Sequence, residues 1–171
     1  TLCRHKPYLL LQNTDFEKFG PAEVERYFAR SMFWGVYPSM FSVDASTHPY
    51  WTEPRWYDRD RASFKKYIPA VKKLSAAGWD PITLARSDDP AVWVERFGSL
   101  LTVMNGSAAP VSATVEYEIG KTWHLPAAGS IEVIDIVRGK AIAEVKTALS
   151  IRFPVALEPG EARALEFRLR K

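Results

Sequence analysis

Residues 31–58, SMFWGVYPSMFSVDASTHPYWTEPRWYD, form the stretch around which we expect the rest of the chain to be organised. It begins on the apolar end of a helix, passes through a short buried strand over 35–40, and opens into a proline-containing loop over 43–58. Functional residues concentrate on loops held by a rigid scaffold, so large aromatics in this loop suit a platform over a ligand better than an ordinary core. The aromatic and charged side chains of the loop are Tyr50, Trp51, Trp56 and Tyr57 with Asp44, His48, Glu53, Arg55 and Asp58.

Strands and helices are predicted to alternate on both sides of this stretch. Residues 6–13 form a continuous apolar run with polar ends, which is typical of a strand buried on both faces. Pro21 stands at the favoured first position of an amphipathic helix over 21–34. A second helix is expected to begin near Asp58 and to be kinked or divided at Pro69. The order strand, helix, strand, helix predicts parallel strands joined by crossover helices.

From residue 91 onward the pattern changes to short strands without helices. The clearest strand is TVEYEI at 114–119, in which polar and apolar residues alternate with period 2. Turn sequences such as NG at 105–106 separate the strands, and the turn cluster SDDP at 87–90 separates them from the first half. We therefore predict an α/β domain over 1–90 and an antiparallel β-sandwich over 91–171. The expected strands of the sandwich are 92–105, 111–119, 130–137, 141–147, 149–156 and 162–169.

The first half raises a problem of burial. Parallel sheets occur almost only with both faces covered, and two strand–helix units cannot cover both faces alone. Two solutions remain open: the segment is the end of a larger α/β domain, or it leans on the sandwich. The chain starts at Thr1 without a methionine, so we expect it to be a piece of something longer.

Composition excludes several classes of protein. The 171 residues are 47% hydrophobic and 25% charged, which is ordinary for a globular protein. A net charge of +3 does not indicate a nucleic-acid partner, and no apolar run approaches the roughly 20 residues that a membrane span needs. The single cysteine, Cys3, cannot form an internal disulfide.

Four segments together resemble the C-terminal part of a barrel-type glycoside hydrolase: KPYLLLQNTDFEKF, ERYFARSMFWGVYPSMFS, DRASFKKYIPAVKKLSAAGWDPIT and VWVERFGSLLTVMN. The resemblance covers nearly the whole chain. It implies that 1–90 are the last strand–helix units of a (β/α)8 barrel and 91–171 the C-terminal β-sandwich of such an enzyme. Strands one to six would be missing, and the catalytic carboxylates, which commonly stand on the middle strands, are expected outside this chain.

Candidate site residues follow the two predicted strands of the first half. Asn13 and Asp15 come just after the first strand, on the face of a barrel where substrate and catalytic groups gather. Asp15 could bind sugar hydroxyls, act as one of the two carboxylates that a glycosidase needs, or only cap the turn before the helix. Asp44 follows the second strand on the same rim and is interpreted as a ligand-binding residue, with Glu53 as a further polar candidate.

The aromatic residues have two interpretations. Trp51 and Trp56 could stack on the apolar faces of sugar rings or pack against the neighbouring domain. For Trp34 and Tyr37 packing is favoured. The catalytic residues stay unassigned, with Asp15 as a weak candidate, and the predicted substrate-binding residues are Asn13, Asp15, Asp44, Trp51, Glu53 and Trp56.

No cofactor or metal site is predicted. His5, His48 and His124 show no ligand spacing with one another or with Cys3, and the sequence has no GxGxxG, P-loop or GxSxG motif. The basic residues from Arg55 to Lys73 are interpreted as a solvated helix face rather than a nucleic-acid surface.

The predicted function is that of the C-terminal portion of a glycoside hydrolase-like, carbohydrate-active protein that contributes sugar-binding residues. The alternative is a non-catalytic carbohydrate-binding or structural β-sandwich module. The expected partners are an oligosaccharide or glycoside and either the missing remainder of a barrel or a second copy of the chain, with no nucleic acid and no membrane.

Overall fold

Two α-helices dominate the first half of the described residues. The structure, a computed structural model, describes residues 9–10, 13–125 and 129–170. Helix α1, Pro21–Phe33, begins with proline as predicted and has Arg30 in its last turn, where a positive charge interacts favourably with the helix dipole. Helix α2, Pro54–Ala77, ends at Gly78, whose φ of +78° is a left-handed conformation that glycine adopts without strain.

Helix α2 differs from its prediction at the start and in the middle. It begins at Pro54 rather than near Asp58, so Trp56 and Tyr57 belong to the helix and not to a loop. Pro69 lies inside the helix without dividing it. A proline there removes one backbone hydrogen bond, and the burial of the following turn against α1 and the sheet offsets that cost.

The remaining described elements are strands and two short 3-10 turns. Four strands of two residues lie around α1: β1 (Leu9–Leu10), β2 (Asn13–Thr14), β3 (Tyr37–Pro38) and β4 (Phe41–Ser42). The strands that follow α2 are β5 (Trp79–Asp80), β6 (Ala85–Ser87), β7 (Val92–Phe97), β8 (Leu100–Asn105), β9 (Val111–Tyr117), β10 (Ser130–Asp135), β11 (Lys140–Lys146), β12 (Ile151–Leu157) and β13 (Ala162–Arg170). The 3-10 turns are η1 (Tyr50–Thr52) and η2 (Ile119–Lys121).

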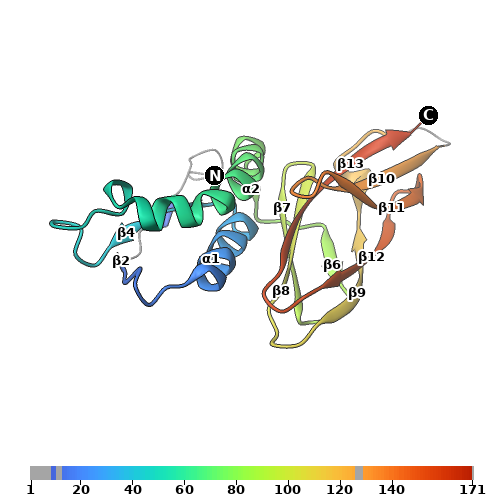
Figure 1. Ribbon diagram of the computed structural model, residues 1–171. Coiled ribbons are helices and arrows are strands. Elements are labelled where there is room, and N and C mark those ends of the chain that lie inside the picture. Colours follow the sequence, from blue (N-terminus) through green and yellow to red (C-terminus); the bar gives the residue numbers. More distant parts are fainter. Residues whose placement is uncertain (1–8, 11–12, 126–128, 171) are drawn as a thin grey trace.

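Three layers result from these elements, as Figure 1 shows. The helices pack on one face of a six-stranded antiparallel sheet in the order β11-β10-β13-β8-β7-β5, and a three-stranded sheet β12-β9-β6 covers the other face. Strand β8 is buried on both faces because Leu100 and Met104 contact the helices while Leu101 and Val103 contact the second sheet. One cluster of buried side chains therefore fills each gap between layers.

The predicted fold class, the last units of a (β/α)8-type barrel before a sandwich, is wrong. The described residues are predominantly strand in mostly antiparallel sheets, with only two α-helices. Parallel pairing is limited to two residue pairs between β1 and β3 and two between β2 and β4. The helices bury their apolar faces on the antiparallel sheet, where Thr102 donates a 2.8 Å hydrogen bond to the carbonyl of Phe33. Of the two solutions to the burial problem, leaning on the sandwich is the one observed.

Several individual strand predictions are confirmed. Strand β9 has the predicted alternation, with Ala113, Val115 and Tyr117 buried. The run 92–105, expected as one strand, is a hairpin of β7 and β8 that turns at Gly98 with a φ of +57°. The predicted strand at 6–13 lies largely outside the described residues. The division at residue 90 stays a prediction, although β5 and β6 precede it and pair with β7 and β9.

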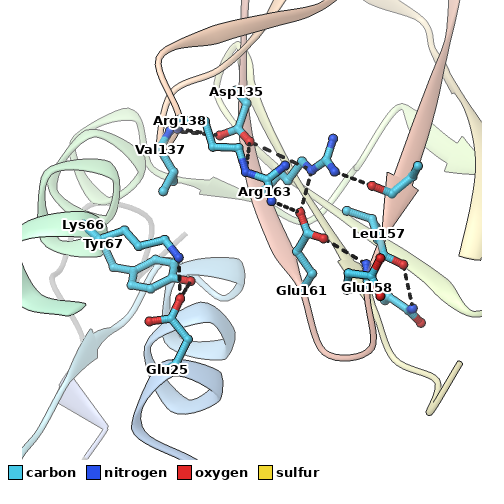
Figure 2. Close-up of polar contacts among 12 residues, drawn as sticks. Glu25, Lys66, Tyr67, Asp135, Val137, Arg138, Leu157, Glu158, Glu161 and Arg163 are labelled. Carbon is cyan, nitrogen blue, oxygen red and sulfur yellow. Dashed lines mark hydrogen bonds and ion pairs between the residues drawn. The ribbon is translucent and has the colours of Figure 1, made fainter. Parts of the chain in front are cut away.

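A network of charged residues joins the turns at one end of the sheets, as Figure 2 shows. The buried carboxylate of Asp135 accepts hydrogen bonds from the backbone N–H groups of Val137 and Arg138 and so fixes the β10–β11 turn. Glu161 accepts from Arg138 at 2.7 Å and from Arg163 at 2.8 Å. Its partners lie on both hairpins, so this network is a structural connection between β10–β11 and β12–β13.

Neither helix of the described residues is both long and apolar enough to cross a lipid bilayer.

Candidate functional site

A cavity of about 300 Å³ lies beside the ends of strands β2 and β4. The two strands are parallel neighbours, with Asn13 opposite Phe41, so the chain leaves both in the same direction. Figure 1 shows them at the end of the helical part that faces away from the sheets. The residues that line the cavity are Asp15, Phe16, Glu17, Ser42, Val43, Asp44, His48, Arg55 and Trp56.

Asp15 stands directly after β2 and caps the turn that leads to α1. Its carboxylate accepts a 3.1 Å hydrogen bond from the backbone N–H of Glu17 and pairs with Lys18 at 3.1 Å. The hydrogen bond from Lys18 is the main cause that holds the pKa of Asp15 below its ordinary value. The turn-capping interpretation is therefore confirmed, and the same carboxylate also faces the cavity.

Asp44 stands two residues after β4, one position beyond the place equivalent to Asp15. Its carboxylate accepts a short hydrogen bond from the hydroxyl of Ser42 and lies 2.9 Å from Nδ1 of His48. Its carbonyl accepts from the N–H groups of Thr47 and His48, which closes a turn and holds the imidazole over the carboxylate. Ser42 first, and His48 after it, keep the pKa of Asp44 below its ordinary value.

Besides the residues that follow β2 and β4, the first turn of α2 lines the cavity. The guanidinium of Arg55 forms an ion pair with Glu17 at 2.5 Å and lies 5.1 Å from the ring centroid of Trp56. The ring of Trp56 is only 5% exposed and packs on Phe16 at a centroid distance of 5.3 Å. Arg55 therefore supplies hydrogen-bond donors at the cavity, and Trp56 forms its buried floor.

Three of the predicted site residues do not line this cavity. Asn13 is exposed on β2, one position before the buried Thr14. Trp51 is 58% exposed and packs on Tyr57 and Phe64, with centroid distances of 5.5 and 5.3 Å. Glu53 reaches the site indirectly through a 3.4 Å ion pair with Arg55. Asp15, Asp44 and Trp56 are the predicted residues that the fold brings together.

Sequence reasoning missed His48 and Arg55. The sequence pattern places Arg55 on a solvated helix face, whereas it stands in the first turn of α2 and points to the cavity. His48 was expected in the same loop, but the only chemical role considered for it was that of a metal ligand. The spacing Asp44-x3-His48 inside a loop was the available signal, because a turn of that length can bring a carboxylate and an imidazole into contact.

The chemistry of the cavity favours hydrogen bonding to a neutral polar ligand. Asp15 and Glu17 form ion pairs with Lys18 and Arg55 at 3.1 and 2.5 Å, and Asp44 lies 2.9 Å from Nδ1 of His48, so each carboxylate has a polar partner. Two carboxylates with lowered pKa values are ionised at neutral pH and accept hydrogen bonds from hydroxyl groups. Among the described residues no group of three or more His, Cys, Asp or Glu side chains could hold a metal ion.

No protein-family model matches the chain. No curated protein matches it either. Among solved structures, it is similar to a GH27 β-L-arabinopyranosidase from Geobacillus stearothermophilus, with 13% identity and a TM-score of 0.43 over 83% of this chain and 29% of that one. A structure named only as a glycoside hydrolase has 16% identity and a TM-score of 0.42 over 95% and 39% of the two chains. A GH30 endoxylanase from Clostridium papyrosolvens has 12% identity and a TM-score of 0.36 over 94% and 41%.

The chain thus spans between 29% and 41% of the length of these three structures. All three are glycoside hydrolases by name, and the identities and TM-scores are low. With TM-scores of 0.43 or below, these likenesses assign neither a family nor a function to the chain.

Proposed function

We propose that this chain is part of a carbohydrate-active protein and binds a sugar in the cavity beside β2 and β4. The observation that carries the proposal is the meeting of Asp15 and Asp44, from two neighbouring parallel strands, with Arg55 from α2 in one cavity. Carboxylates accept hydrogen bonds from hydroxyl groups, and a guanidinium donates in a fixed fork to ring or hydroxyl oxygens. A volume of about 300 Å³ is at the lower end of the range for small-molecule sites.

The contacts of the charged groups support a neutral polar ligand over an anion. Asp15 pairs with Lys18 and Glu17 with Arg55, and Asp44 is hydrogen-bonded to His48, so each carboxylate that lines the cavity has a partner and the lining offers more acceptors than cations. A polyhydroxylated ligand both donates and accepts hydrogen bonds, and the cavity offers acceptors on Asp15 and Asp44 and donors on Arg55. His48 contributes its second ring nitrogen, Nε2, as a further donor or acceptor.

The carboxyl groups favour binding over catalysis. Glycoside hydrolysis requires one carboxyl group that stays protonated and gives its proton to the leaving group, and such a group has a raised pKa. The pKa values of Asp15 and Asp44 are both lowered by hydrogen-bond donors. These two residues are therefore assigned to ligand binding, which favours the non-catalytic alternative for this chain; a general acid would have to come from elsewhere in a larger protein.

The test is direct measurement of sugar binding by isothermal titration calorimetry. The panel contains arabinose, galactose, glucose and short xylo- and gluco-oligosaccharides. Asp44→Asn keeps the shape of the side chain but removes the charge that orients His48 and accepts hydroxyl protons. We expect it to weaken binding about tenfold or more, as loss of a charged hydrogen-bond partner does. Asp15→Asn is expected to have a similar effect.

The matched control is Asp58→Asn, the same chemical change on the exposed face of α2 outside the cavity. It should leave the affinity unchanged. Equal affinity of Asp44→Asn, Asp15→Asn and the unmodified chain, with melting temperatures intact, would contradict the proposed site. Turnover of an aryl glycoside by the isolated chain would contradict the assignment of these carboxylates to binding.

A further inference from the structure

The outer face of α1 carries a second and larger cavity, which the proposed function does not use. It has a volume of about 620 Å³ and a mainly apolar lining. Trp34, at the C-terminal end of the helix, is 43% exposed. The lining residues are Phe19, Glu23, Arg26, Tyr27, Arg30, Ser31, Trp34 and Val36.

Positions at equal distance from the middle of this helix face carry side chains that can contact each other favourably. An aromatic ring stands at each end, Phe19 before the helix and Trp34 after it. Moving inward, an acidic residue at 23 is matched by a basic residue at 30. At the centre, Arg26 and Tyr27 are consecutive in the sequence, and both line the cavity. A face of this kind is complementary to itself when turned through 180°.

We infer that α1 is the contact surface of a homodimer, in which two copies of the helix pack antiparallel about a two-fold axis between positions 26 and 27. Such an axis places 19 opposite 34, 23 opposite 30 and 26 opposite 27 of the second copy. The three contacts are an aromatic pair, an ion pair and a cation–π pair, and the symmetry makes each of them twice. A parallel arrangement would instead face Glu23 with Glu23 and Arg30 with Arg30.

The charges on this face are available for that contact. Arg30 is exposed and has no ion-pair partner within the described ranges. Glu23 pairs with Arg26 at 3.1 Å, with side chains 42% and 65% exposed, so it can accept a second cation without being released from the first. The helix is held firmly from behind, because Val24, Phe28 and Met32 are buried in the core. The inference is independent of the proposed sugar site, which lies on other residues.

Charge exchange tests this arrangement. In Glu23→Arg, two copies would bring the introduced guanidinium against Arg30, and in Arg30→Glu two copies would bring the introduced carboxylate against Glu23. We expect each variant alone to dimerise about tenfold more weakly than the unmodified chain, because the repulsive contact occurs twice. When the two variants are mixed, positions 23 and 30 of one chain face opposite charges on the other. The mixture should therefore form a heterodimer more readily than either variant forms a homodimer.

The measurement is sedimentation velocity of the full chain across a wide range of concentration, with circular dichroism to confirm that each variant is folded. The matched control is the ion pair between Glu118, which precedes η2, and Lys121 at its end, changed in the same way as Glu118→Arg and Lys121→Glu; these variants should associate like the unmodified protein. The inference is supported if the unmodified chain dimerises, each single variant dimerises more weakly, and the mixture of the two variants dimerises again. A monomer at every concentration, or single variants that dimerise normally, would overturn it.

Discussion

The two buried clusters on either side of the six-stranded sheet are built from different side chains. The cluster between the sheets consists mainly of valine, isoleucine and leucine at alternate strand positions, with Phe153 and Phe167 at its centre. The cluster under the helices is rich in aromatic rings, and these continue outward through partly buried residues to exposed Trp34 and Trp51. Extensive strand pairing encloses the first cluster, whereas the second reaches the surface at both cavities for which we propose a role.

The cluster between the sheets belongs to the rigid scaffold, whereas the cluster under the helices borders both proposed sites. Paired strands fix side chains on both faces of a sheet at regular spacing, so the inner cluster leaves little freedom for a ligand. The helical part is held by its packing on that sheet and by two-residue parallel ladders, which leaves loops free to bring polar groups together.

The largest loss of stability is expected from a cavity in the cluster between the sheets. Phe153 is fully buried and lies 5.8 Å from Phe167, in an edge-to-face arrangement. Phe153→Ala should lower the free energy of unfolding by about 3–5 kcal/mol, because it removes a large apolar side chain and leaves a cavity. Chemical denaturation of the variant gives this value. A loss below about 1 kcal/mol would show that the sheets are not packed as described.

The second prediction compares two tryptophans on the same side of the molecule. Trp56 is 5% exposed and Trp51 is 58% exposed, although sequence patterns alone lead to the same interpretation for both. Trp56→Ala should cost about 2–4 kcal/mol, since its ring packs on Phe16 in the core. Trp51→Ala should cost about 1 kcal/mol or less, since only its ring contacts with Tyr57 and Phe64 are lost. Equal losses for the two variants would contradict the distinction between core and surface.

The smallest effect is expected at the contact between the helices. Burial alone would raise the pKa of Glu25, but hydrogen bonds from Lys66, Tyr67 and Ser63 outweigh it and leave the pKa below its ordinary value of 4.5. A carboxyl group whose pKa is lowered by folding contributes stability above that ordinary value and loses it as the pH falls through the folded value. The contribution at neutral pH should be below about 1 kcal/mol because the group is partly exposed.

Thermal unfolding at several pH values, with Glu25→Gln as the comparison, measures this contribution. The difference in melting temperature between the unmodified chain and the variant should shrink as the solution becomes more acidic than the ordinary pKa. A difference that grows in acid would mean that Glu25 is destabilised by its surroundings.

The sequence predicted those parts of the fold that depend on local periodicity. Helix α1 and strand β9 follow from spacing alone, and both are confirmed. The hairpin at Gly98 was missed because hydrophobic residues continue on both sides of the turn and hide it. The fold class was wrong because the order of strands and helices does not say what covers each helix. That depends on contacts between distant residues, such as Thr102 with Phe33.

Only part of the candidate site was predictable from the sequence. Asp15 and Asp44 were expected on one rim because each follows a strand, and the structure brings them to one cavity. Arg55 could not be assigned to that cavity because its position depends on a helix start that sequence patterns did not reveal. For His48 the spacing from Asp44 was a signal, but the contact also requires the turn closed by the carbonyl of Asp44. The role of these side chains in sugar binding stays a prediction.

Chemical-shift mapping of the isotope-labelled chain tests most directly whether the cavity beside β2 and β4 binds a sugar. Amide signals are followed by NMR during titration with the sugars that bind in calorimetry. We expect the largest shifts at 15–17, 42–44 and 55–56, with little change along strands β9 and β12. Shifts concentrated on α1 or on the sheets, or no shift at saturating sugar, would contradict sugar binding in this cavity.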